Sequence, residues 1–209
     1  VQHPGGVTFT SIAAGDKHTC ALDGSSGQAY CWGYGGDGAV GNNSLLGSKV
    51  PVAVSQGGVT FTAVTTEYNH SCGLTSGGQA YCWGYNFYGQ LGDNSTTNRK
   101  TPVAVSQGGV TFVQVATGAA HTCGLTSGGQ DYCWGQNTYG QLGTGNTTQS
   151  LTPVAVSQGG VTYVSAHTGG HQSFGLDSGG QTYGWGRNNF GQVGDGTSTN
   201  RTSPVAVSH

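Results

Sequence analysis

The sequence contains very little charge. Only 7% of its 209 residues are Asp, Glu, Lys or Arg, and eight acidic and six basic side chains leave a net charge of −2 at neutral pH. Nucleic-acid binding requires clustered basic side chains that displace counterions, so the composition argues against a nucleic-acid partner. Disorder maintained by charge repulsion is excluded for the same reason.

Long apolar runs, methionine and enzyme motifs are also missing. No hydrophobic stretch approaches the about 20 residues that a membrane-spanning helix needs, so we expect no membrane span. The lack of methionine and the start at Val1 predict a processed or excised segment. No nucleophile elbow, zinc-protease motif, phosphate-binding loop or dinucleotide fingerprint occurs. We therefore predict that the protein is not an enzyme and uses no cofactor and no metal.

Glycine is abundant instead, at 41 residues, and the chain consists of four copies of one unit. A GVTF or GVTY marker begins each copy, at Gly6, Gly58, Gly109 and Gly160. The period is therefore 52, 51 and 51 residues, a length typical of propellers and related arrays. We predict a single repeat array over residues 1–209. Its units are expected at about residues 6–57, 58–108, 109–159 and 160–209.

Each unit is predicted to hold four short antiparallel strands. In the second unit they are expected at residues 59–65, 70–75, 79–84 and 102–106. Alternation along AYCWG places Ala and Cys on one face and Tyr and Trp on the other, so both faces are bulky or apolar. No segment shows a 3.6-residue apolar period, and no substantial helix is expected. A repeated four-stranded sheet that is buried on both faces indicates an all-β fold of β-propeller blades, with the tryptophans in the core between blades.

The six cysteines lie in pairs on either side of a glycine-rich turn. A register that pairs Cys72 with Cys82 also pairs Leu74 with Ala80 and brings the two cysteines close to disulfide geometry. The fourth unit replaces both cysteines together, as expected of a bonded pair. The predicted disulfides are Cys20–Cys31, Cys72–Cys82 and Cys123–Cys133.

Two alternatives to disulfides remain, namely reduced cysteines packed in the core and zinc ligation. The spacing of ten or eleven residues within a pair lacks the short knuckle of a zinc site. Disulfides form outside the reducing cytosol, so the prediction places the protein in the secreted or cell-surface class.

The second unit resembles the regulator of chromosome condensation repeat. Shared features are a histidine before the second predicted strand, a Trp-Gly pair, the string Asn-x-x-Gly-Gln-Leu-Gly and a closing Pro-Val. The resemblance covers residues 6–208, and the first unit departs from the string, reading WGYGGDGAVGN, while the fourth has Val193 in place of its leucine. It implies a β-propeller, which in this family typically has seven blades. Closure with four units, completion by other chains, membership of a longer array and an open end-to-end assembly all remain possible.

The paired cysteines make the chain similar to secreted bacterial members of the family. The predicted disulfides and the lack of basic tails argue against the nuclear exchange-factor role of the best-known member. We predict a secreted or cell-surface, non-catalytic propeller that serves as a structural or protein-interaction module. Self-association into an oligomer or extracellular filament is a hypothesis within this prediction. The alternative is a carbohydrate-binding module that uses loop aromatics, namely Tyr34, Tyr68, Tyr85, Phe87, Tyr88 and Tyr139.

Loop positions that vary between otherwise similar units are the candidate interaction residues, because variable loops on a constant scaffold carry specificity. Neutral drift is the alternative interpretation. The candidates are Asp16, Lys17, Tyr34, Glu67, Tyr68, Asn69, Tyr85, Gln136 and Arg187.

Two further residue sets recur between units. The histidines at equivalent places are interpreted as anchors that bond backbone groups at a turn, with a metal-binding ring as the alternative; they are His18, His70 and His121. Five Asn-x-Ser/Thr sequences are candidate glycosylation sites, although Asn and Thr are also common turn residues. These sites are Asn42, Asn69, Asn94, Asn146 and Asn200.

Overall fold

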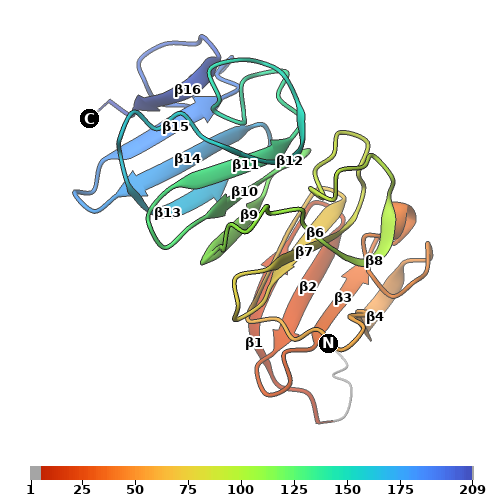
Figure 1. The fold of residues 1–209 in the computed structure, drawn as a ribbon. Helices are drawn as coiled ribbons and strands as arrows, with labels where there is room; N and C mark the ends of the chain where they lie inside the picture. The colour runs from red at the N-terminus through yellow and green to blue at the C-terminus, as the bar shows by residue number, and fades with distance from the viewer. Residues whose placement is uncertain (1–5, 209) are drawn as a thin grey trace.

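The computed structural model describes residues 6–208, and these residues form four antiparallel sheets of four strands each (Figure 1). Every sheet follows chain order, so each unit is one up-and-down blade. The all-β prediction is confirmed. Among the described residues, helix is limited to one 3₁₀ turn, η1 (Gly36–Gly38).

The four blades have the following strands. The first contains β1 (Phe9–Ala14), β2 (His18–Asp23), β3 (Ala29–Gly33) and β4 (Ser48–Ala53). The second contains β5 (Ala63–Glu67), β6 (His70–Leu74), β7 (Ala80–Gly84) and β8 (Arg99–Ala104). The third contains β9 (Gln114–Thr117), β10 (His121–Leu125), β11 (Asp131–Gly135) and β12 (Ser150–Ala155). The fourth contains β13 (Tyr163–Thr168), β14 (Gln172–Asp177), β15 (Thr182–Gly186) and β16 (Arg201–Ala206).

The central hairpin of each blade has the predicted register. In the second blade Cys72 lies opposite Cys82 and Leu74 opposite Ala80. The close Cα–Cα separation of 4.1 Å is that of a non-hydrogen-bonded antiparallel pair, where side chains approach most nearly. The structure contains the three predicted disulfides, at Cys20–Cys31, Cys72–Cys82 and Cys123–Cys133.

The outer limits of two strands in the second unit differ from the sequence prediction. The first strand begins at Ala63 rather than at residue 59, because Phe61 donates its N–H to Gly27 O in the turn of the preceding blade. The fourth strand spans Arg99–Ala104 instead of 102–106. The pairing of this strand with β7 is irregular between Arg99, which lies opposite Gly84, and Val103, which lies opposite Cys82. Pro102, which has no N–H to donate, lies in this irregular stretch.

Blades bury their faces against one another. The cysteine face of the first blade packs against Phe61 and Trp83 of the second, and the same arrangement joins the second blade to the third and the third to the fourth. Each buried indole donates to a backbone carbonyl of the preceding blade, over 2.9–3.0 Å. A glycine beside each indole lets the backbone approach, since an added Cβ would lie 2.7–2.8 Å from the ring nitrogen. These glycines are Gly41, Gly92 and Gly143.

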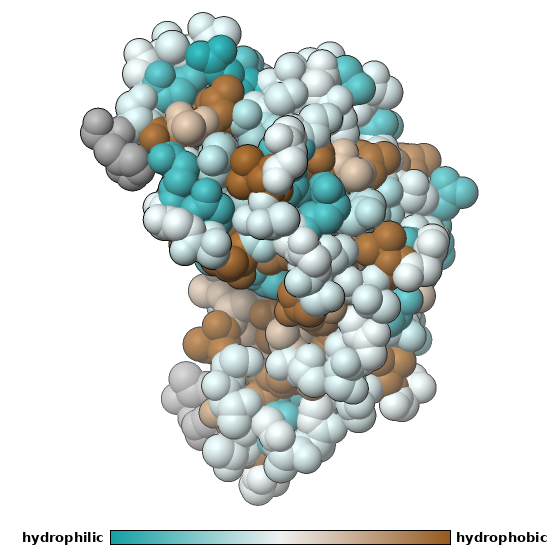
Figure 2. All heavy atoms as spheres, turned by 60° about the vertical axis from the view of Figure 1, so that its left-hand side comes forward, coloured by the Kyte–Doolittle hydropathy of each residue, from teal (hydrophilic) through white to brown (hydrophobic). Residues whose placement is uncertain are grey.

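The four blades form an open arc over residues 6–208. Three hydrophobic clusters join four blades, and no cluster in this part of the chain joins the first blade to the fourth. Trp83, Trp134 and Trp185 are fully buried, whereas Trp32 on the first blade is only partly buried. Figure 2 shows hydrophobic side chains at the hollow on the left side of the view. The free faces of the first and fourth blades therefore leave apolar surface uncovered.

The disulfides stabilise the hairpins that carry each inter-blade core. We expect the double substitution C72A/C82A to lower the free energy of unfolding by about 2–3 kcal/mol, the chain-entropy value for a loop of this length. Guanidinium denaturation followed by tryptophan fluorescence measures the change. The control is the same titration with reductant, which should shift the wild type more than the variant. An unchanged midpoint in the variant, or six free thiols in the native protein, contradicts the prediction.

Candidate functional site at one end of the blades

Eight loops gather at one end of the arc, which we call the loop face. In an up-and-down sheet the first and third connections lie at the same end, so each blade contributes two loops. The loop face comprises residues 15–17, 34–47, 68–69, 85–98, 118–120, 136–149, 169–171 and 187–200. All nine candidate interaction residues and all five candidate glycosylation residues lie on it or directly beside it.

A buried asparagine organises the long loop of the second blade. Asn86 is fully buried, and its Nδ2 donates to Asp93 Oδ1 and to the carbonyls of Ser95 and Thr97, each over 3.1 Å. Its Oδ1 accepts from the N–H of Leu91 at 2.9 Å. Asn137 and Asn188 make similar contacts in the next two blades, whereas the first blade has Gly35 there and forms η1 instead. Sequence reasoning did not single out this asparagine as a site residue, although its recurrence in three units identifies it.

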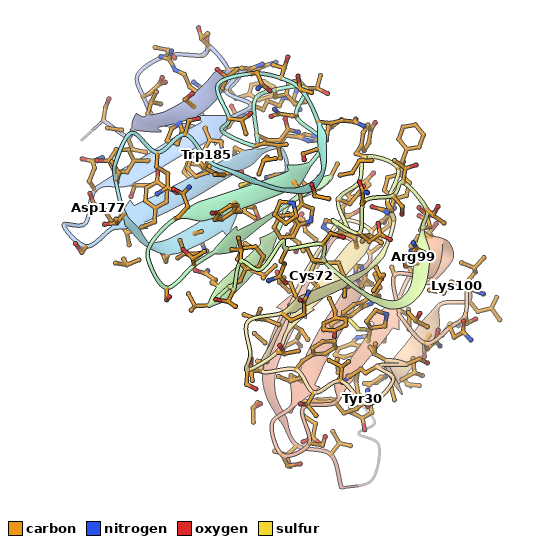
Figure 3. The ribbon with its side chains drawn as sticks, in the orientation of Figure 1. Tyr30, Cys72, Arg99, Lys100, Asp177 and Trp185 are labelled. Carbon is orange, nitrogen blue, oxygen red and sulfur yellow. A yellow bond between two sulfur atoms is a disulfide. The ribbon has the colours of Figure 1, made fainter. Side chains whose placement is uncertain are left out.

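The asparagine-bound loop also carries a shielded ion pair. Arg99 Nη2 lies 2.7 Å from the Asp93 carboxylate, and Arg201 and Asp195 are paired in the same way in the fourth blade. Arg99 and Lys100 lie at the outer edge of the second blade in Figure 3. The Asp93 and Asp195 carboxylates are therefore each paired with the arginine that begins the following strand.

A cavity of about 550 Å³ opens at the loop face between the second, third and fourth blades. Its lining comprises four tyrosines, one asparagine, one glutamine, one histidine and two alanines. The lining residues are Tyr68, Asn69, Tyr85, Tyr88, Ala119, Ala120, Gln136, Tyr139 and His171. The volume lies within the range of small-molecule sites.

The structure brings together only part of each predicted set. Tyr68, Asn69, Tyr85 and Gln136 of the interaction set line the cavity, and Tyr88 and Tyr139 join them from the aromatic set. The remaining members lie outside the lining, which also includes Ala119, Ala120 and His171. The members outside are Asp16, Lys17, Tyr34, Glu67, Phe87 and Arg187.

Two cations lie over aromatic rings next to the cavity. Lys17 Nζ lies 5.0 Å from the Tyr68 ring centre and 5.7 Å from that of Tyr34. The guanidinium of Arg187 lies 5.3 Å from the ring centre of Tyr139. Each cation therefore lies over the ring of a cavity tyrosine, at a distance where cation–π attraction operates.

The backbone at Tyr68 adopts a left-handed conformation, with φ of 43°. For a bulky residue this costs about 1–3 kcal/mol and is concentrated at functional positions. Burial, together with the nearby Asp16 carboxylate, raises the pKa of the preceding Glu67. Burial and the Arg187 cation lower the pKa of His171, so its imidazole is neutral at physiological pH.

The candidate glycosylation residues occupy different environments. Asn94 and Asn146 are exposed in the long loops, whereas Asn42 and Asn200 are partly buried. Asn69 lines the cavity, and Ser71 of the same sequon is fully buried. Glycosylation at these positions remains a prediction.

The buried histidines form hydrogen bonds between blades. His70 Nε2 lies 2.9 Å from the Thr122 hydroxyl, and His121 Nε2 lies 2.8 Å from the Ser173 hydroxyl. Each hydroxyl donates onward to a carbonyl oxygen of the preceding blade, so the histidine Nε2–H is the donor. His18 contacts Ser71 in the same way at 2.6 Å. The histidines thus bond a side-chain hydroxyl of the next blade, and His18 in addition hydrogen-bonds the backbone of Tyr68 there.

The cysteines supply no metal ligands. Among residues 6–208, one group has the proximity of a metal site, namely Cys123, Asp131 and Cys133, and its two sulfur atoms are bonded to each other. Burial raises the pKa of Asp131 to about 8, so this carboxyl is predominantly protonated at neutral pH. Zinc ligation by the three cysteine pairs does not fit these disulfide-bonded sulfur atoms.

The fold and the loop face together define the class of the protein, a β-propeller repeat array with a cavity at one end of its blades. The regulator of chromosome condensation (RCC1) repeat model matches more than half of the chain, and the chain belongs to this family. The matched segments are residues 77–125, 129–176 and 179–209, and a second RCC1 repeat model matches residues 9–39 and 112–141. Within residues 6–208, no helix has the length and apolarity to cross a membrane.

Curated relatives include the ultraviolet-B receptor UVR8 of Arabidopsis thaliana, which is 35% identical over 97% of this chain and 46% of its own length. The human E3 ubiquitin-protein ligase HERC2 is 30% identical over 94% of this chain and 4% of its own length. The chain thus spans less than half of each of these relatives.

Solved structures of similar fold include human WBSCR16, with a TM-score of 0.90 and 23% identity. It matches all of this chain and 55% of its own. Yeast RCC1 (Prp20), solved bound to Kap60, has a TM-score of 0.88 and 20% identity over all of this chain and 50% of its own. At these identities the likeness shows the fold alone, and RCC1-like propellers are a type of protein-interaction module.

We expect the histidine bonds to make stability pH-dependent. Burial lowers the pKa of His18 to about 4 and those of His70 and His121 to about 3, while the unfolded chain binds protons below about pH 6.5. The folded state binds fewer protons at these three histidines between these limits, so their contribution to stability is fully present above pH 6.5 and falls toward pH 4. The slope approaches about 1.4 kcal/mol per pH unit for each histidine.

Denaturant midpoints measured between pH 7.5 and pH 4.5 test this dependence. His121→Gln should reduce the pH slope by roughly one third, because glutamine does not titrate and already occupies the equivalent place as Gln172. His167→Gln, at an exposed position, is the matched control and should leave the slope unchanged. An unaltered slope in the His121→Gln variant contradicts the assignment.

Proposed function

We propose that this chain is an extracellular, non-catalytic recognition module that binds a protein partner through its loop face. The observation that carries the proposal is the convergence of four of the nine variable positions, Tyr68, Asn69, Tyr85 and Gln136, on one tyrosine-lined cavity. Loop residues differ between blades, while the residues of the inter-blade cores recur. A constant scaffold with a varied end is the usual design of a binding protein.

The composition of the loop face supports a macromolecular partner. Tyrosine, arginine and exposed phenylalanine are enriched where proteins bind proteins, and the loop face presents Tyr34, Tyr68, Phe87 and Phe190 with 43–85% of each residue exposed. The three disulfides favour an oxidising compartment, and we place the protein in the secreted or cell-surface class on that ground.

A photo-crosslinking experiment tests the proposed face. p-Benzoyl-phenylalanine replaces Phe87 or Phe190 at the loop face, and replaces Ser127 in a turn at the opposite end as the matched control. After illumination on cells of the source organism, we expect one partner, identified by mass spectrometry, to be linked from both loop-face positions and not from Ser127. Crosslinks that are equal at both ends, or that arise only from Ser127, contradict the proposal.

Self-assembly is the second candidate function, and the open ends of the arc favour it. Among the described residues, the indole N–H of Trp32 has no acceptor, while the three equivalent indoles bond to a preceding blade. Phe174 on the free face of the fourth blade is partly exposed, whereas the equivalent Cys72 and Cys123 are buried. A second copy that places its first blade against this face would cover both side chains, and head-to-tail contacts of this kind form rings or filaments.

Sedimentation equilibrium over a wide concentration range tests self-assembly. We expect species heavier than the 21.1 kDa chain that vanish in the Trp32→Arg variant, because a charge in that face opposes burial. Leu46→Arg, in an exposed loop, is the control and should still associate. A wild-type chain that remains at 21.1 kDa at the highest concentration overturns this candidate.

A further inference from the structure

The tyrosine cavity has no formal charge in its wall. Its nine lining side chains are tyrosine, asparagine, glutamine, alanine and a histidine whose pKa is lowered by burial. Lys17 and Arg187 lie over rings of lining tyrosines but are not themselves among the lining residues, and Lys17 also approaches Asp16 at 4.0 Å. A charged ligand would therefore enter the cavity without a counter-ion among the lining residues, so a neutral ligand fits best.

Hydrogen-bonding capacity in the cavity is largely unused. Within residues 6–208, none of the four tyrosine hydroxyls makes a hydrogen bond to another residue, and each can both donate and accept. A ligand that pairs these four hydroxyls must therefore supply groups that donate and groups that accept.

The strained turn at Tyr68 is a separate observation. A left-handed φ at a tyrosine persists only where surrounding contacts hold it, and here Lys17 lies over its ring. The equivalent turn positions are Asp16, Ala119 and Gly170, so the second unit alone places an aromatic ring there. The contacts that hold this strained conformation thus place one tyrosine in the wall of the cavity.

We propose that this cavity binds a neutral saccharide, with tyrosine rings stacked on sugar C–H faces and tyrosine hydroxyls bonded to sugar hydroxyls. Flat aromatic faces, neutral walls and groups that both donate and accept match the alternating apolar and hydroxyl surfaces of a sugar ring. The volume of about 550 Å³ accommodates a short oligosaccharide. The inference rests on the proposed function only in that both use the loop face. It identifies a glycan as the group that is recognised on the partner.

Binding is measured with printed neutral and acidic oligosaccharides, followed by calorimetric titration of the best binder and saturation-transfer NMR. We expect saturable binding to a neutral oligosaccharide, weakened by about five- to tenfold in Tyr85→Ala and in Tyr139→Ala through loss of ring contact. Tyr85→Phe keeps the ring and removes only the hydroxyl, so it should show a smaller loss. Phe190→Ala removes an exposed aromatic side chain outside the cavity and should bind like wild type.

Each other result overturns the proposal. Absence of binding to every neutral saccharide, binding to acidic glycans only, or affinity unchanged by both tyrosine-to-alanine substitutions excludes a neutral-sugar cavity. Thermal unfolding of each variant separates loss of binding from loss of the fold. If the loop-face crosslinks persist while no saccharide binds, the recognition module stands and this inference alone fails.

Discussion

Every blade of this protein depends on burial of two apolar faces that it cannot cover by itself. The cysteine face of one blade meets the tryptophan and phenylalanine face of the next, and an indole N–H sets their relative position by bonding to a backbone carbonyl. Hydrophobic burial provides the driving force, and the hydrogen bonds select one packing geometry. With charged side chains so scarce, the chain relies on this contact rather than on surface ion pairs.

Because the junctions between blades are constant, the loops can vary in sequence. Because each junction repeats the same indole, glycine and histidine–hydroxyl contacts, substitutions at the loop face leave the positions of the blades unchanged. Asn86 and its two equivalents hold the long loops from within, through side chains that never reach the surface. The exposed parts of these loops are thus free to vary, and Tyr85, Gln136 and Arg187 occupy one position in successive units with entirely different chemistry.

Contacts within one unit were predictable from the sequence, and contacts between units were not. The Cys72–Cys82 register follows from the symmetry of the residues about a short turn, and alternation along AYCWG identifies the two buried faces. The hydrogen-bond partner of His70 and the hydrogen bond of Phe61 to the turn of the preceding blade depend on the angle between blades, which no local pattern encodes. The lining of the cavity depends on the same angle, since it includes Tyr68 but not Tyr34, although the sequence made both residues candidates on equal grounds.

The distribution of junction residues shows what each unit is built to contact. Three junctions contain three disulfides, three buried tryptophans and three histidine–hydroxyl bonds. The first unit supplies the cysteines and histidine of such a junction, and the fourth supplies the tryptophan and serine. On its far face the fourth unit has Gln172 in place of histidine, and the Phe174 ring packs over Gly184, where a Cβ would lie 2.9 Å from it. Any neighbour of that face therefore meets an amide and a phenyl ring, so its contact must differ from the three junctions within the arc.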